Sequence, residues 1–101
     1  MHAFSHLSIR VISLTRATAR RSAVAAQLAS LRIPFRFYDG IDAAALSAQE
    51  LASFRQTHKA MPGMSDAELA CDLSHFRVIS AWMEEDDTPY LCVLEDDATL
   101  G

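Results

Sequence analysis

Three consecutive carboxylates, Glu95, Asp96 and Asp97, are the side chains of this 101-residue sequence best suited to chemistry. They follow residues 90–94, an apolar and β-favouring run that predicts a short buried strand. Acids at a strand end occupy a fixed place on the rim of a sheet and repel one another unless a cation lies among them. Hard divalent cations such as Mg²⁺ or Mn²⁺ prefer these oxygen ligands and often share them with phosphates. The alternative, a solvated acidic turn, is favoured by the triplet alone.

The arginines form a second group with chemical potential. Residues 1–38 contain six arginines and no acid, whereas residues 39–101 contain thirteen acids and three bases. This asymmetry predicts a site where both segments face an anionic ligand, the acidic one through a metal. Arg20 and Arg21 fall at the start of a predicted helix, a position that is mildly unfavourable for a cation unless phosphate binds there. Solvated charges distributed by chance are the alternative.

The segments that must position these charges alternate between strand and helix patterns. Residues 8–14 and 33–38 predict strands, while residues 17–31 are alanine-rich with apolar residues at helical spacing. Capping boxes at Ser47 and Ser65 predict helices to about residues 58 and 84. The order β-α-β-α-α-β predicts a three-layer α/β domain with a mainly parallel sheet. Ligands of such folds bind at the carboxyl ends of the strands, so the arginines and the acids are expected to meet there.

The helix predicted at residues 65–84 carries apolar residues at steps of three and four, which predict one buried stripe. The stripe comprises Leu69, Leu73, Phe76, Ile79 and Met83. His75 lies beside it, where a histidine is more often packed or hydrogen-bonded than catalytic. The acidic run at residues 84–87 opposes the helix dipole and is expected to be a solvated loop.

Cysteine usage and hydropathy bear on the compartment. Cys71 and Cys92 lack a CxxC partner, so buried free thiols in a reducing compartment are expected. No apolar run is long enough to span a membrane, and the N-terminus lacks the apolar core of a signal peptide. We expect a cytoplasmic protein, with peripheral association with the inner membrane left open. No basic patch interleaved with aromatic residues is present, so nucleic acid is not an expected partner.

Three motifs together resemble glycosyltransferase family 25, which includes the lipooligosaccharide galactosyltransferases of bacteria. They are residues 67–75 (AELACDLSH), Trp82, and residues 93–97 (VLEDD). The strand at residues 11–14 followed by Arg20-Arg21 resembles the opening of the family, and Asp39-Gly40 fits its second turn. Ala67 and Ala70 depart from the family pattern, which usually has glycines there; alanine would tighten any close backbone approach.

The resemblance implies a GT-A-like (Rossmann-like) fold and transfer of a hexose, expected to be galactose, from a UDP-sugar to a saccharide acceptor of lipooligosaccharide. It implies that Glu95, Asp96 and Asp97 form the DXD-like element that binds Mn²⁺ or Mg²⁺, although the first acid is a glutamate. The donor-binding residues implied are Thr15, Arg20, Arg21, Asp39, Gly40 and Asp96.

The family domain continues beyond its Glu-Asp-Asp motif, so residues 1–101 resemble the N-terminal nucleotide-sugar-binding part of a longer transferase. The acceptor site and catalytic base are expected in the remainder, and no catalytic residue is assigned here. The strand at residues 90–94 looks central and built for burial on both faces, so the isolated chain is expected to self-associate and to be inactive. Two alternatives stay open: a non-catalytic truncated or interaction domain that retains the fold, and an unrelated acidic α/β domain that binds a metal or phosphate.

Overall fold

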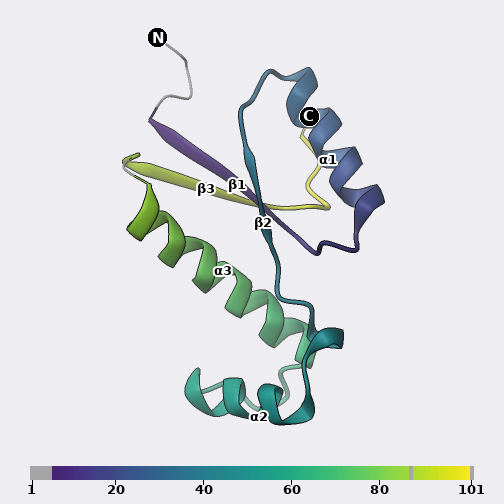
Figure 1. The fold of residues 1–101 in the computed structure, drawn as a ribbon, viewed down its shortest axis with the longest axis vertical. Helices are drawn as coiled ribbons and strands as arrows, with labels where there is room; N and C mark the ends of the chain where they lie inside the picture. Colours follow the sequence, from purple (N-terminus) through teal and green to yellow (C-terminus); the bar gives the residue numbers. More distant parts are fainter. Residues whose placement is uncertain (1–5, 87, 101) are drawn as a thin grey trace.

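The computed structural model describes residues 6–86 and 88–100, which form three strands and three α-helices (Figure 1). Their order confirms the predicted β-α-β-α-α-β succession, with one additional 3₁₀ turn, η1. The elements are β1 Leu7–Ser13, α1 Thr18–Ser30, β2 Arg36–Asp39, η1 Ala43–Ala45, α2 Ala48–Thr57, α3 Asp66–Glu85 and β3 Tyr90–Glu95.

The sheet is parallel throughout, with strand order β2-β1-β3. Val11 of β1 pairs in register with Phe37 of β2 and with Leu94 of β3. In the described sheet β1 is therefore the central strand and β3 lies at an edge, as expected for the isolated chain. That β3 is central in a longer protein stays a prediction. An apolar run indicates burial but not lateral position; here the middle of β3 is half-buried, and Tyr90 at its start is 66% exposed.

Helices α1 and α3 cover opposite faces of the sheet (Figure 1). Successive residues of a strand point to opposite faces. Val11 faces α1 and forms a buried cluster with Val24 and Leu28 of that helix. The neighbouring Arg10 points to the other face and reaches Asp86, the residue that directly follows α3. The predicted three-layer α/β architecture is thus confirmed.

The helix starts differ in how their backbone N–H groups are satisfied. Ser47 with Glu50, and Ser65 with Glu68, form the complete capping boxes predicted for α2 and α3. Helix α1 begins after Ala17, which provides no side-chain cap. None of the helices within the described residues is both long and apolar enough to cross a membrane.

The apolar stripe predicted on α3 is only partly correct. Leu69 and Leu73 are buried, but Phe76, Ile79 and Met83 are 60%, 42% and 72% exposed. The remaining buried positions are Ala70, Ser74 and Val78. Small side chains let the helix approach its neighbours closely: the Ser74 hydroxyl donates to the Ala70 carbonyl at 2.7 Å and accepts the backbone N–H of Ile41 at 2.8 Å. A prediction based on the positions of large apolar residues does not identify a buried face that is formed partly by small residues.

The acidic run after α3 is not simply a solvated loop, which corrects that expectation. Its third residue, Asp86, lies 3.5 Å from Arg10, whose side chain is buried in the central strand. The backbone N–H of Thr88 donates to Asp86 at 2.9 Å. This bond, followed by those from the Ser8 hydroxyl and Arg10, lowers the pKa of Asp86 to about 2. The last acid of the run, Asp87, lies outside the described residues.

Candidate functional site

A cleft of about 550 Å³ lies at the carboxyl ends of the parallel strands. The end of β1, the start of α1, the segment after β2, the first turns of α3 and the end of β3 all contribute to it. Of the residues expected to bind donor or metal, Arg20, Gly40, Glu95 and Asp96 line this cleft. The prediction that the basic and acidic segments meet at one edge of the sheet is therefore confirmed.

Asp96 links the two charged segments within the cleft. Its Oδ2 accepts a 2.7 Å hydrogen bond from the Ser13 hydroxyl at the end of β1. Its Oδ1 lies 3.7 Å from Arg20 Nη1, and the Asp96 side chain is only 10% exposed, whereas that of Arg20 is 67% exposed. One such pair on an open surface contributes little to stability. The exposed guanidinium therefore remains available to a ligand in the cleft.

Arg21 is next in sequence but has a different environment. Its Nη2 donates to the Ser13 carbonyl at 2.8 Å and to Asp39 Oδ1 at 2.7 Å, while its Nε donates to the Leu14 carbonyl at 3.2 Å. The guanidinium also lies over the Phe37 ring, 4.9 Å from its centroid. Arg21 thus joins the ends of β1 and β2 to α1, and the predicted donor contact of Arg21 stays a prediction.

Gly40 is the residue that brings the segment after β2 close to β1. Its backbone N–H donates to the Ser13 carbonyl at 2.9 Å. A Cβ at this position would lie 3.2 Å from Ile12 Cγ2 and 3.4 Å from Leu14 Cδ2, the first of which is tighter than ordinary contact. The glycine predicted as part of a turn therefore allows close packing beside the cleft, where a larger residue would displace the Ile12 side chain slightly.

Arg16 and Asp42, which the sequence analysis did not single out, form a further ion pair at the cleft. Arg16 Nε lies 2.6 Å from Asp42 Oδ2, and Nη2 lies 3.2 Å from Oδ1. This paired hydrogen bond holds the pKa of Asp42 below its ordinary value. Asp42 also caps η1 by accepting the Ala44 N–H at 3.1 Å. An aspartate two residues after the Asp39-Gly40 turn was the available signal.

The arginine-rich and acidic parts of the chain are therefore partners of each other. Five of the six N-terminal arginines lie within 4.0 Å of an acid from the later part. The pairs are Arg10–Asp86, Arg16–Asp42, Arg20–Asp96, Arg21–Asp39 and Arg36–Asp86. Much of the charge asymmetry is thus explained by intramolecular pairing. Arg16 and Arg20 both combine exposure with a place in the cleft. Arg16 is held by two hydrogen bonds to Asp42, whereas Arg20 has only the longer 3.7 Å contact with Asp96.

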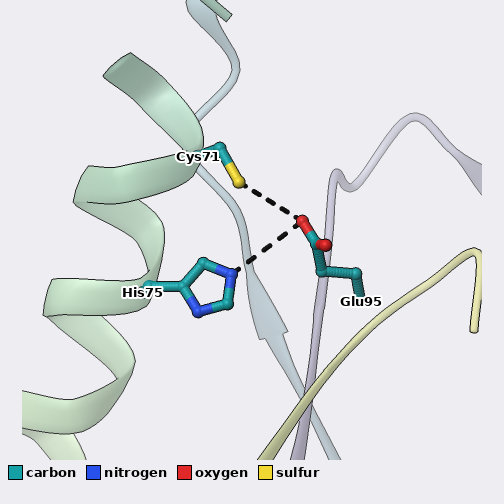
Figure 2. Close-up of side chains that lie close together, drawn as sticks. All are labelled: Cys71, His75 and Glu95. Carbon is teal, nitrogen blue, oxygen red and sulfur yellow. Dashed lines mark hydrogen bonds and ion pairs between the residues drawn. The ribbon is translucent and has the colours of Figure 1, made fainter. Parts of the chain in front are cut away.

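Glu95, the last residue of β3, turns toward α3. Figure 2 shows its carboxylate between Cys71 and His75. Cys71 Sγ donates to Oε1 at 3.2 Å, and His75 Nε2 lies 3.9 Å from the same oxygen. Partial desolvation and this hydrogen bond raise the pKa of the Cys71 thiol to about 11. Both cysteines are free thiols as predicted, but Cys71 is exposed and Cys92 half-buried, because Cys71 lies on the flank of α3 and not on its buried face.

The remaining predicted site residues lie apart from this arrangement. Thr15 and Asp97 are exposed, and neither is among the residues that line the cleft. The segment after Asp97 is anchored to α1 by Gln27, whose Nε2 donates to the Ala98 carbonyl at 3.0 Å and whose Oε1 accepts the Leu100 N–H at 2.8 Å. This anchoring fixes where the chain turns after β3, and with it the position of Asp96.

The carboxylates fit a hard divalent cation only in part. Mg²⁺ and Mn²⁺ require oxygen ligands, and Asp96 offers its carboxylate within the cleft. Glu95 also lines the cleft, but its Oε1 faces a thiol and an imidazole. Asp96 is therefore the residue that best meets the requirement, and the assignment of Mn²⁺ or Mg²⁺ to all three acids is still a prediction.

A parallel α/β sheet with a charged cleft at the carboxyl ends of its strands defines a class of ligand-binding α/β proteins. Within that class, residues 6–101 match the family described as Glycosyltransferase family 25 (LPS biosynthesis protein). The chain belongs to glycosyltransferase family 25, as the sequence resemblance indicated.

Comparison with curated proteins gives relatives of the same kind. The chain is 36% identical over 91 residues to the lacto-N-neotetraose biosynthesis glycosyltransferase LgtB of Neisseria gonorrhoeae, covering 90% of this chain and 32% of the relative. It is 34% identical over 96 residues to the lipooligosaccharide biosynthesis protein lic2B of Haemophilus influenzae, covering 90% and 34%. The chain thus spans about a third of the length of these relatives.

Proposed function

We propose that this chain is the nucleotide-sugar-binding part of a glycosyltransferase of lipooligosaccharide biosynthesis. The whole protein would transfer a hexose, with galactose as the first candidate, from a UDP-sugar to a saccharide acceptor. The observation that carries this proposal is the cleft in which exposed Arg20 lies beside Asp96 at the carboxyl ends of β1 and β3. The names of the relatives, which refer to lacto-N-neotetraose and lipooligosaccharide biosynthesis, support the acceptor class.

The residues in and beside the cleft would have different roles in binding a diphosphate. Arg20 would donate charge-assisted hydrogen bonds to phosphate oxygens. Helix α1 begins after Ala17, a residue that lines the cleft and provides no side-chain cap, so the N–H groups of the first turn would be available to a phosphate. Such a helix start favours a negative charge. Arg21 would act indirectly, because its hydrogen bonds keep β1 and β2 in position beneath the ligand.

A divalent cation, Mn²⁺ or Mg²⁺, forms part of the proposal. Asp96 would be its principal ligand in this chain, with Glu95 and Asp97 contributing where their carboxylates can turn toward the cleft. When bound, the cation would neutralise the charge that develops on the diphosphate leaving group. A short acidic turn supplies few ligands, so we expect weak Mn²⁺ binding without nucleotide and tighter binding with UDP.

Isothermal titration calorimetry with UDP and Mn²⁺ tests the donor site. Arg20→Ala should weaken UDP binding by about 1.5–3 kcal/mol, the contribution of a hydrogen bond to a charged group. Arg36→Ala is the matched control, because Arg36 is also an exposed arginine but does not line the cleft. Equal losses in the two variants would refute the site. Equal Mn²⁺ affinity with and without UDP would refute the shared metal–diphosphate arrangement.

Transfer itself is proposed for the whole protein, because an acceptor pocket and a base near the attacking hydroxyl are also needed. That the relatives are about three times as long supports this division. We expect the isolated chain to show no transfer from UDP-galactose to a lactosyl acceptor, and to self-associate through β3, an edge of the described sheet. Light scattering and a transfer assay test both; an active monomer would contradict them.

A further inference from the structure

Cys71, His75 and Glu95 gather three different ligand atoms on the α3 side of the sheet. Cys71 and His75 lie four residues apart on α3, which places their side chains on one face of the helix. Glu95 reaches them from the end of β3 (Figure 2). One sulfur, one ring nitrogen and one carboxylate oxygen lie within 4.8 Å of one another. Glu95 lies 24 residues after Cys71 in the sequence, so the return of the chain from α3 into β3 creates the cluster.

We propose that Cys71, His75 and Glu95 bind a Zn²⁺ ion. Zinc accepts thiolate, imidazole and carboxylate ligands together, whereas Mg²⁺, Mn²⁺ and Ca²⁺ select oxygen. This site is chemically distinct from the oxygen site proposed around Asp96, and it does not depend on sugar transfer. The two sites share Glu95 as a possible ligand, so a zinc ion bound by Cys71 and His75 would prevent Glu95 from binding the cation proposed at Asp96.

The distances are compatible with tetrahedral coordination after small side-chain movements. Bonds of about 2.0–2.3 Å to zinc place the ligand atoms of a tetrahedral site roughly 3.3–3.6 Å apart. Cys71 Sγ and His75 Nε2 lie 3.2 Å and 3.9 Å from Glu95 Oε1. The largest separation in the cluster is at most 4.8 Å, so the atoms must close by roughly 1 Å. Cys71 and Glu95 are exposed and His75 is half-buried, which leaves the side chains room to adjust.

Three protein ligands leave one tetrahedral position free, as in zinc sites that hold a water or a substrate atom. Cys71 and Glu95 line the cleft, so the fourth position would open toward it. An ion here would also strengthen the link between the end of β3 and α3, which the hydrogen bond from Cys71 to Glu95 already joins. If zinc binds the folded chain and not the unfolded chain, the thermal stability of the chain would increase with the zinc concentration.

Cobalt(II) titration of the 101-residue chain tests the proposal, because Co²⁺ replaces Zn²⁺ and reports its ligands by absorption. We expect one Co²⁺ per chain, a thiolate-to-cobalt charge-transfer band, intense tetrahedral visible bands, and displacement by Zn²⁺. Cys71→Ser should abolish the charge-transfer band and weaken zinc binding by at least about 100-fold, the upper range for loss of an outer-shell partner. Cys92→Ser, which removes the other thiol, should leave both unchanged.

The histidines provide a second matched pair. His75→Gln should weaken zinc binding to a similar extent, whereas His58→Gln should not, because His58 follows α2 and lies beside Phe76, outside the cluster. Circular dichroism of each variant establishes that it is folded. Absence of a thiolate band in the folded wild-type chain would overturn the proposal, as would loss of the band in Cys92→Ser. Displacement of Co²⁺ by a modest excess of Mg²⁺ would also overturn it, since that result would indicate an oxygen site.

Discussion

Substitution by alanine should lower the free energy of unfolding at Arg21 but hardly change it at the adjacent Arg20. Arg21→Ala removes charge-assisted hydrogen bonds to the carbonyls of Ser13 and Leu14, and such bonds contribute about 1.5–3 kcal/mol. It also removes the contact with the Phe37 ring, worth roughly 0.5–1 kcal/mol. We expect the free energy of unfolding to fall by about 2–4 kcal/mol in total.

Two observations indicate that the loss of stability should not exceed that range. The Ser13 carbonyl also accepts the Gly40 N–H, and the Leu14 carbonyl accepts the Ala17 N–H, so the substitution leaves neither acceptor without a partner. The ion pair of Arg21 with Asp39 adds less than about 1 kcal/mol, because the Asp39 side chain is mostly exposed.

Urea unfolding followed by circular dichroism measures the difference, with the slope of the transition checked for constancy. Arg20→Ala is the internal control and should change the free energy of unfolding by no more than about 0.5 kcal/mol. Arg21→Lys should recover only part of the loss, since an ammonium cannot reproduce the planar fork of hydrogen bonds. If Arg21→Ala and Arg20→Ala unfold at the same urea concentration, the structural role assigned to Arg21 is refuted.

Three further outcomes are expected. The pKa of Asp86 is lowered to about 2, so its carboxylate stabilises the fold above the ordinary value of 3.8, and this stabilisation is lost as the pH falls toward 2. Asp86→Asn should therefore reduce the fall in the free energy of unfolding as the pH is lowered from 3.8 toward 2. The same fall in the variant and in the wild-type chain would contradict this. The pKa of Cys71, raised to about 11, predicts slow alkylation by iodoacetamide at pH 8 despite exposure, with faster reaction in Glu95→Gln, as measured by peptide mass spectrometry; equal rates would count against the hydrogen bond. Leu73→Ala should lower the free energy of unfolding by about 2–5 kcal/mol, whereas Met83→Ala should change it by less than about 0.5 kcal/mol; similar losses would restore the single buried stripe.

The elements were predictable because their signals are local. Ser47 with Glu50, and Ser65 with Glu68, are three residues apart and satisfy each other at the helix start, so no distant partner is needed. The parallel sheet followed from the alternation of strands and helices. Because the carboxyl ends of parallel strands meet at one edge, this alternation alone predicts that Arg20 and Asp96 lie there together.

The details that sequence reasoning missed depend on distant partners. Arg10 lies between apolar residues of β1, and a charged residue at such a position requires a buried partner, but only the fold identifies it as Asp86. The packing of α3 depends on Ala70 and Ser74, which a search for large apolar residues overlooks. Similarly, the different environments of Arg20 and Arg21 follow from the rotation of about 100° between successive helix residues.

The strand order has a consequence for the timing of folding. The central strand β1 is made before β2 and β3, and its partner β3 pairs with it from roughly 80 residues further along the chain. During synthesis β1 can pair with β2 and pack against α1 early, because these elements are close in sequence. The other edge of β1 has no partner strand until α2, α3 and β3 have left the ribosome. Throughout that interval β1 presents unpaired backbone groups, and Arg10 lacks the acid that neutralises it.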